Sequence, residues 1–395
     1  MIYLDNAATS QFKMKDDIII DTISSAMRIH WKNPSSLYAQ KVREMIDICR
    51  QNVANFIGAK PNEILFTSGA SESNNMAIRG WFDKNCTSFT TLPYIIISEV
   101  EHKSIDSIKQ NSIIRKHMHY CRVDKYGLLN QNQLETMLSI LTKNKSNPIL
   151  VSVIFANNEI GSINNIKAIS DLVHQYGGIL HVDATQAFGH IPIDVEELSI
   201  DMMSASGHKI SPVLKGIGFL YKREGIEINP LIYGSQEQGL RGGTENTFGI
   251  IGLSKAIEFC NVSNDKIKEM TDKRDYFINK LQSKFGCRLT GHPTNRLPNN
   301  ISVVLPEDIS AESVLHMLSM ANIFVSTSSA CNSKSIEKSY VLKAIGLTDD
   351  AIMRTIRITI SDDITYQDID SFIFELDKTI KVIRIDWSGD SVSSI

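Results

Sequence analysis

The sequence predicts an α/β protein with a mainly parallel sheet and a second, smaller α+β domain. Near-continuous apolar strands alternate with helical segments, which is typical of a parallel sheet covered by helices on both faces. Five of the strands run directly into clusters of polar residues, at the strand ends where such sheets bind ligands. After about residue 260 the pattern changes, and 395 residues are enough for two domains.

The first part of the chain contains two helices followed by a series of strands. A short extended segment at residues 2–4 precedes helices at 16–30 and 42–56, and apolar residues recur in the second helix at steps of three and four. Strands are expected at 63–67, 94–98, 149–155, 178–182, 201–206 and 216–221, with a helix at 164–176. Polar clusters follow the first five strands, so we expect one shared site at their carboxyl ends.

The second part of the chain mixes helices and strands differently. A charged amphipathic helix at 264–285 precedes a strand at 299–305, a helix at 311–320, a strand at 355–360 and a helix at 366–385. The alternation Thr-Ile-Arg-Ile-Thr-Ile at 355–360 predicts a half-buried strand. We therefore expect a large domain at 15–260 and a small domain formed by 1–14 and 261–395.

Charge and composition exclude several classes of protein. The net charge of -3 argues against nucleic-acid binding, and no apolar run approaches the ~20 residues that span a bilayer. The N-terminus, MIYLDNAATS, has neither a basic region nor an apolar signal core, so we expect a soluble cytoplasmic protein. None of the six cysteines forms a CxxC pair, so neither a metal site nor a disulfide framework is expected. Five of them are interpreted as inert packing: Cys49, Cys86, Cys121, Cys260 and Cys287.

Lys209 and Asp183 each follow an apolar strand where an unpaired charge is costly. Lys209 would be tolerated there as a Schiff base, and its alternative is a surface lysine after an edge strand. Asp183 needs a cationic partner, and its alternative is the cap of a helix. A Schiff-base lysine and an acid beside a pyridinium nitrogen are the groups that hold pyridoxal 5′-phosphate (PLP).

Two further polar segments fit the same cofactor. The turn at 68–71, Ser-Gly-Ala-Ser, lies between a strand and a helix, so its backbone N–H groups form a natural phosphate site unless a serine simply caps the helix. His102 follows its strand and could stack over the cofactor ring and move protons, or be only a hydrogen-bonded loop residue. The phosphate site, the acid and the lysine in this order make PLP the best single explanation.

The smaller part of the chain carries two more candidates. Arg357 suits the α-carboxylate of an amino acid, because arginine binds carboxylates through two parallel hydrogen bonds. Its alternative is a surface arginine, and Arg354 is the competing choice. Cys331 lies in the small, polar segment 326–335, where an exposed thiol can become a nucleophilic thiolate or be an incidental surface cysteine.

Together these segments resemble the cysteine desulfurases, PLP enzymes of aminotransferase class V, over almost the whole chain. The matching motifs are YLDNAAT (3–9), NPSS (33–36), TSGASESNN (67–75), EH (101–102), NNEIG (157–161), HVDATQ (181–186), SGHK (206–209), RGGTEN (241–246), SSAC (328–331) and SYVLKAIG (339–346). The resemblance implies the PLP-dependent transferase fold type I with a mainly parallel seven-stranded sheet, and a homodimer with sites at the subunit interface. The long serine-rich loop before Cys331 is similar to that of the group associated with iron–sulfur cluster assembly.

The resemblance also implies a role for each matching residue. Lys209 would bind the cofactor as an imine, Asp183 would pair with its pyridine nitrogen, and His102 would stack on its ring. Arg357 would bind the substrate carboxylate. Two residues would lie near the 3′-oxygen of the cofactor, the second of them also near the substrate: Gln186 and Asn158. The phosphate would be held by Ala70, Ser71, Ser206, His208 and, from the other subunit, Thr244.

The implied reaction converts L-cysteine to L-alanine. The thiolate of Cys331 attacks the substrate sulfur, and the resulting persulfide passes to an acceptor protein in iron–sulfur cluster assembly, tRNA thiolation or DNA sulfur modification. One alternative is another PLP enzyme, such as an aminotransferase or a C–S lyase, but neither needs the thiol of Cys331. A second is a non-catalytic sulfur-relay partner, against which the intact Lys209 and Asp183 argue. Tyr38, where the family often has His, and a longer 211–216 segment depart from the family pattern.

Overall fold

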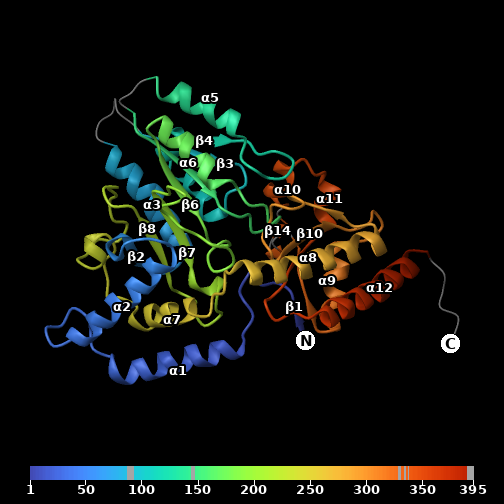
Figure 1. Cartoon of the computed structure of the whole chain (residues 1–395). Coiled ribbons are helices and arrows are strands. Elements are labelled where there is room, and N and C mark those ends of the chain that lie inside the picture. The colour runs from blue at the N-terminus through green and yellow to red at the C-terminus, as the bar shows by residue number, and fades with distance from the viewer. Residues whose placement is uncertain (87–92, 144–146, 328–330, 333–334, 337, 389–395) are drawn as a thin grey trace.

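Two parts of the molecule lie side by side, one around a seven-stranded sheet and one around a four-stranded sheet (Figure 1). The computed structural model describes residues 1–86, 93–143, 147–327, 331–332, 335–336 and 338–388, without the side chains of 331–332, 335–336 and 386–388. The predicted α/β class with a mainly parallel sheet is confirmed, while the domain boundaries at residues 14 and 260 stay predictions.

The large sheet has the strand order β2-β8-β7-β6-β5-β3-β4. Its strands are β2 (Ile64–Thr67), β8 (Gly218–Lys222), β7 (Met202–Ser206), β6 (Ile179–Asp183), β5 (Ile149–Ile154), β3 (Tyr94–Ser98) and β4 (Met118–Cys121). Strand β8 is antiparallel to both neighbours, and the other pairs are parallel. The seventh strand, β4, was not recognised in the sequence, because this edge strand keeps its two middle residues partly exposed and has no continuous apolar run.

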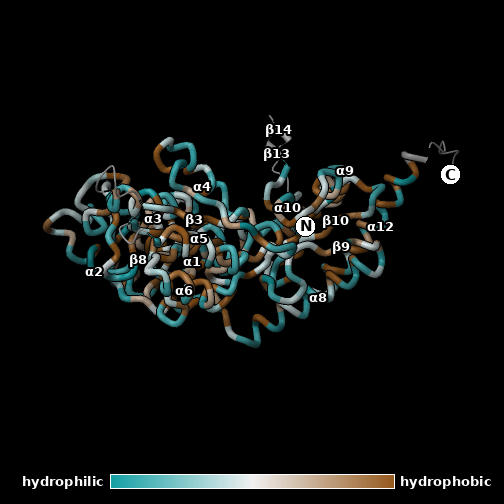
Figure 2. Tube along the Cα trace, turned by 90° about the horizontal axis from the view of Figure 1, so that it is seen from above, coloured by the Kyte–Doolittle hydropathy of each residue, from teal (hydrophilic) through white to brown (hydrophobic). Residues whose placement is uncertain are grey.

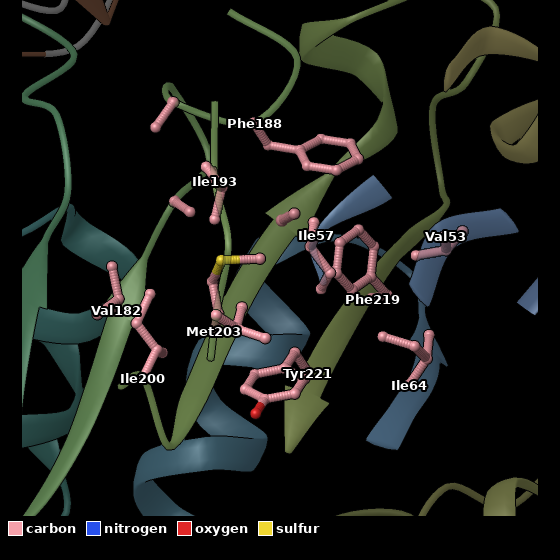
Figure 3. Close-up of a cluster of buried hydrophobic side chains, with 14 of the residues drawn as sticks. Val53, Ile57, Ile64, Val182, Phe188, Ile193, Ile200, Met203, Phe219 and Tyr221 are labelled. Atoms are coloured by element: carbon pink, nitrogen blue, oxygen red, sulfur yellow. The ribbon is translucent and has the colours of Figure 1, made fainter. Parts of the chain in front are cut away.

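Helices cover both faces of the large sheet. One face carries α1 (Met14–Ile29), α2 (Gln40–Phe56), α5 (Gln131–Leu141), α6 (Ile166–Gln175) and α7 (Thr247–Ile257), and α3 (Ala70–Asn85) packs on the other. Figure 3 shows part of the first core, where Phe219 of β8 lies close to Ile57 and Phe188. The rings of Phe188 and Phe219 meet edge to face at 5.2 Å. Each such fully buried side chain contributes roughly 1.5–3 kcal/mol, so this core fixes the sheet on which the polar strand ends lie.

The small sheet has the order β12-β15-β10-β9. It consists of β12 (Ser326–Thr327), β15 (Thr355–Thr359), β10 (Asn300–Val304) and β9 (Arg288–Leu289), with helices α8 (Asn264–Phe285), α9 (Ala311–Met320) and α12 (Tyr366–Ser388). The N-terminal strand β1 (Ile2–Tyr3) pairs in parallel with β11 (Ile323–Phe324), so the N-terminus lies beside this part in both views (Figures 1 and 2).

The prediction of a half-buried strand at 355–360 is wrong, because every residue of β15 is buried. One face packs on the helices through Ile356 and Ile358. The other face carries Arg357, whose guanidinium forms an ion pair with Asp5 at 2.7 Å. The alternation therefore records two different buried environments.

The remaining elements are short. They are α4 (Lys103–Asp106), α10 (Tyr340–Ala344), α11 (Asp349–Met353), the paired strands β13 (Cys331–Asn332) and β14 (Ser335–Ile336), and 3-10 turns at 61–63, 107–110, 114–116, 207–209 and 237–239. Within the described ranges, no helix combines the length and the apolar character that a membrane span requires. The thiol of Cys86 is exposed, so its interpretation as inert packing is wrong, whereas Cys49, Cys121 and Cys287 are buried.

Candidate active site

A cavity of about 680 Å³ lies at the carboxyl ends of the large sheet, between it and the small part. Ten of the predicted site residues line it: Ala70, Ser71, His102, Asn158, Asp183, Gln186, Ser206, His208, Lys209 and Arg357. Thr244 does not line this cavity and is exposed. Cys331 begins β13, and its side chain is outside the described part.

Lys209 follows β7 in the 3-10 turn at 207–209, with its ammonium group turned into the cavity. Its Nζ donates hydrogen bonds to the carbonyls of Ala7 at 2.6 Å and Ala8 at 2.9 Å. Desolvation, reinforced by the positive charge of Arg357, lowers the pKa of Lys209 to about 8, although Asp183 opposes the shift. About a tenth of this amine is therefore uncharged at pH 7, far more than for a free surface lysine with a pKa of about 10.4.

Asp183 ends β6 and is 2% exposed. Its Oδ1 accepts hydrogen bonds from the backbone N–H of Thr185 at 3.0 Å and from the Thr185 hydroxyl. Its Oδ2 accepts one from Asn74 Nδ2 at 2.8 Å. A turn follows Asp183 and no helix begins there, so its alternative as a helix cap is wrong. These partners are neutral, so the carboxylate can still compensate a cation in the cavity.

The N-terminus of α3 opens into the same cavity. Gly69 precedes it with φ of 146°, and no side chain caps this helix, which contradicts the interpretation of a serine as the cap. The first backbone N–H groups are therefore available to an anion, together with the positive end of the helix dipole. Ser206 Oγ and His208 Nδ1 lie 2.8 Å apart and line the same cavity.

A carboxylate near the anion site is held out of the way. Glu72 lines the cavity, yet its Oε1 accepts a hydrogen bond from Arg241 Nε at 2.9 Å and its Oε2 accepts one from Ser68 N–H at 2.7 Å. Burial alone would raise the pKa of Glu72, but these hydrogen bonds outweigh it and hold the pKa below its usual value. Because Arg241 offsets this charge, an anion can still bind at the helix N-terminus.

Arg357, and not Arg354, reaches the cavity. Its Nη2 forms an ion pair with Asp5 Oδ1 at 2.7 Å, and its Nη1 donates to the carbonyl of Asn158 at 3.2 Å. Among the described residues its buried Nε has no partner. Arg354 instead pairs with Asp350 at 2.6 Å and lines a different hollow. A buried guanidinium with N–H groups to spare is suited to a carboxylate ligand.

The comparison with known proteins agrees with this geometry. A family model described as aminotransferase class-V matches residues 2–372. A cysteine desulfurase IscS from Dictyoglomus turgidum is 38% identical over 394 residues, with 97% of this chain and 95% of the relative covered. This chain belongs to the cysteine desulfurase family of class V aminotransferases.

Solved structures show the same relationship for this cysteine desulfurase family member. A protein titled NifS-like superposes with a TM-score of 0.85 at 29% identity, covering 96% of this chain and 99% of that chain. A structure titled "SspA in complex with cysteine" superposes with a TM-score of 0.76 at 31% identity, covering 91% and 99%. Enzymes of this family depend on PLP, and the predicted cofactor is therefore confirmed at the level of the family.

The cavity of this family member also fits PLP on its own chemistry. Its lining includes a helix N-terminus for a phosphate, a buried carboxylate for a pyridinium nitrogen and a lysine of lowered pKa. Gly218 shows how closely the phosphate end is packed, because a Cβ there would lie 2.6 Å from the Cα of Gly69.

Sequence reasoning missed several residues that support the site. Asn74, Thr185 and the carbonyls of Ala7 and Ala8 hold Asp183 and Lys209, but none was assigned a role. A signal existed for Asn74, which lies one helical turn after Ala70 and therefore on the same side of α3. No local signal pairs Asp5 with Arg357, because 352 positions separate them in the chain.

Proposed function

We propose that this enzyme takes the sulfur of L-cysteine, releases L-alanine, and holds the sulfur as a persulfide on Cys331. The observation that carries the proposal is the joint position of Lys209, Asp183 and Arg357 in one cavity. A lysine and a carboxylate placed for PLP serve many reactions, whereas an arginine at the same cavity selects an amino acid substrate.

Each cavity residue has a task that its surroundings support. PLP, when bound, withdraws electrons from the α-carbon of the substrate. Arg357 binds the substrate carboxylate and so fixes the orientation of the α-carbon. Asp183, held by Asn74 and Thr185, keeps a negative charge at the base of the cavity. Lys209, with its pKa of about 8, can take a proton and return it without a large free-energy cost.

The sulfur step uses the thiol of Cys331. Its thiolate attacks the substrate sulfur, a sulfur–sulfur bond forms, and the bond between that sulfur and the β-carbon of the substrate breaks. The β-carbon takes up a proton, so one L-alanine leaves for each persulfide formed. The persulfide then passes to an acceptor protein. The relatives named IscS favour iron–sulfur cluster assembly as the destination of the sulfur.

The enzyme works as a homodimer in this proposal. Large apolar side chains are exposed along α1 and the segment that follows it, including Met14, Ile29, Trp31, Leu37 and Tyr38. Leu37 is 96% exposed. Exposure of several large apolar side chains in one region is unfavourable unless another protein surface covers them. The exposed Thr244 fits the same proposal, because it would complete the phosphate site of the second copy.

The proposal is tested by incubating the purified enzyme with L-cysteine and measuring alanine and persulfide. Wild type should form both, and Cys331→Ala should form neither beyond background. Cys86→Ala is the matched control, because Cys86 is also an exposed thiol and should be dispensable. Alanine production by Cys331→Ala at the wild-type rate would show that Cys331 is not the group that accepts the sulfur.

A further inference from the structure

A chain of hydrogen bonds connects Asp183 with His102 through two side chains that do not line the cavity. Asn74 of α3 is fully buried, and its Nδ2 donates to Asp183 Oδ2 at 2.8 Å and to Ser104 Oγ at 2.9 Å. Ser104 Oγ lies 2.9 Å from His102 Nδ1, and the backbone N–H of Ser104 donates to the same nitrogen at 3.1 Å. Four contacts thus join a charged group to a titratable one.

The direction of every hydrogen in this chain follows from Asp183. A carboxylate only accepts, so the amide nitrogen of Asn74 must face it. The amide oxygen of Asn74 has no partner among the described residues, so nothing there favours the flipped amide. Because Ser104 Oγ accepts the second amide hydrogen, its own hydrogen is free to donate to His102.

Two donors therefore converge on His102 Nδ1. A ring nitrogen that accepts hydrogen bonds carries a lone pair, so the neutral imidazole has its proton on Nε2. The ring lines the cavity, and Nε2 is the nitrogen that the chain leaves unbound. Protonation of His102 would place a hydrogen on Nδ1 against these two donors and would break the chain.

We propose that Asn74 and Ser104 are positioning residues that fix His102 as the neutral imidazole with its proton on Nε2. The negative charge of Asp183 sets the direction of the hydrogen bonds through which they do so. The tautomer of His102 follows from these hydrogen bonds alone, and only its effect on the reaction rests on the proposed desulfurase function. His102 then presents a hydrogen-bond donor to the cavity, where it stabilises negative charge that develops on the substrate. It cannot act as a base through Nδ1 while the chain is intact.

The charges around His102 agree with a neutral ring. Desolvation in the cleft lowers the pKa of His102, and the cations of Lys209 and Lys103 lower it further, while Asp183 raises it. His208 lines the same cavity, and desolvation lowers its own pKa to about 4, so that it adds no charge near neutral pH. The hydrogen-bond chain adds a geometric reason to this electrostatic one.

The test measures the ring nitrogens of His102 in the holoenzyme by NMR, after selective labelling of histidine with nitrogen-15. The variant His102→Gln assigns the signals among the 10 histidines. Wild type should show an unprotonated Nδ1 and a protonated Nε2. Ser104→Ala keeps the backbone donor to Nδ1 and loses only the hydroxyl, so it should keep this tautomer with a higher pKa for His102, whereas Ser104→Thr, which keeps the hydroxyl, should restore the wild-type pKa.

Steady-state kinetics add a second readout. Loss of one positioning hydrogen bond in Ser104→Ala should lower kcat about tenfold with little change in KM, and Ser104→Thr should recover most of the rate. A wild-type ring protonated on Nδ1 would overturn the inference without any variant. So would a Ser104→Ala enzyme in which the pKa of His102 equals that of wild type. If wild type shows the expected tautomer but makes no alanine, the inferred hydrogen-bond chain from Asp183 to His102 stands and the proposed function is contradicted.

Discussion

Substitution of Arg357 gives the sharpest test of how the cavity selects its substrate. The guanidinium donates one N–H group to Asp5 and one to the carbonyl of Asn158, and its Nε has no partner among the described residues. Three of the five N–H groups of the guanidinium therefore have no partner among the described residues, and two are enough to bind a substrate carboxylate. Hydrogen bonds to charged groups contribute about 1.5–3 kcal/mol each, so the pair is a large part of the binding of a small amino acid.

The two substitutions differ in what they remove. Arg357→Lys keeps the charge but loses the second hydrogen bond, at a cost of about 2 kcal/mol, so KM for L-cysteine should rise about 30-fold. Arg357→Gln also removes the charge and leaves Asp5 unpaired beside the substrate carboxylate. A cost of about 4 kcal/mol, or about a thousandfold in kcat/KM, is expected for truncating a buried charge pair.

The assay is alanine formation over a range of L-cysteine concentrations, with Arg354→Gln as the matched control. Arg354 lies three positions earlier, pairs with Asp350, and contacts a different hollow, so its removal should leave KM within twofold of wild type. A KM for Arg357→Gln within about threefold of wild type would refute the reasoning. Equal effects of Arg357→Gln and Arg354→Gln on KM would show that the overall positive charge, and not the position of Arg357, governs substrate binding.

Two further predictions use the pKa shifts. Desolvation lowers the pKa of Lys209 to about 8, so the rate of PLP uptake by apoprotein should rise with pH, reach half its maximum near pH 8 and level off above it. A rise that continues toward the ordinary lysine pKa of about 10.4 would contradict this shift. Burial raises the pKa of Glu159 to about 7, against the hydrogen bond from Ser339, so folding of wild type loses stability as pH rises from about 4.5 through 7. In urea unfolding, the free energy of unfolding of Glu159→Gln should increase relative to that of wild type from pH 5 to pH 8. A difference between the two proteins that is independent of pH would show that Glu159 does not cause this loss of stability.

The sequence by itself determined the alternation of strands and helices and the polar residues that follow five of the strands. Asp183, Lys209 and the 68–71 turn could be recognised because period, strand length and a charge after an apolar run are local features. The carboxyl ends of parallel strands meet at one edge, so these residues could be placed together without coordinates. The family motifs then supplied the cofactor and the reaction.

Only the tertiary structure decided which groups hold these residues. Lys209 is bound by the carbonyls of Ala7 and Ala8, some 200 positions away, and backbone carbonyls carry no sequence signal. The structure also shows that Arg357 reaches the cavity whereas Arg354 pairs with Asp350 beside a different hollow, a difference that three positions in a sequence do not reveal. The chain from Asp183 through Asn74 and Ser104 needs three separate elements within hydrogen-bond distance, and such distances arise only when the core brings those elements together.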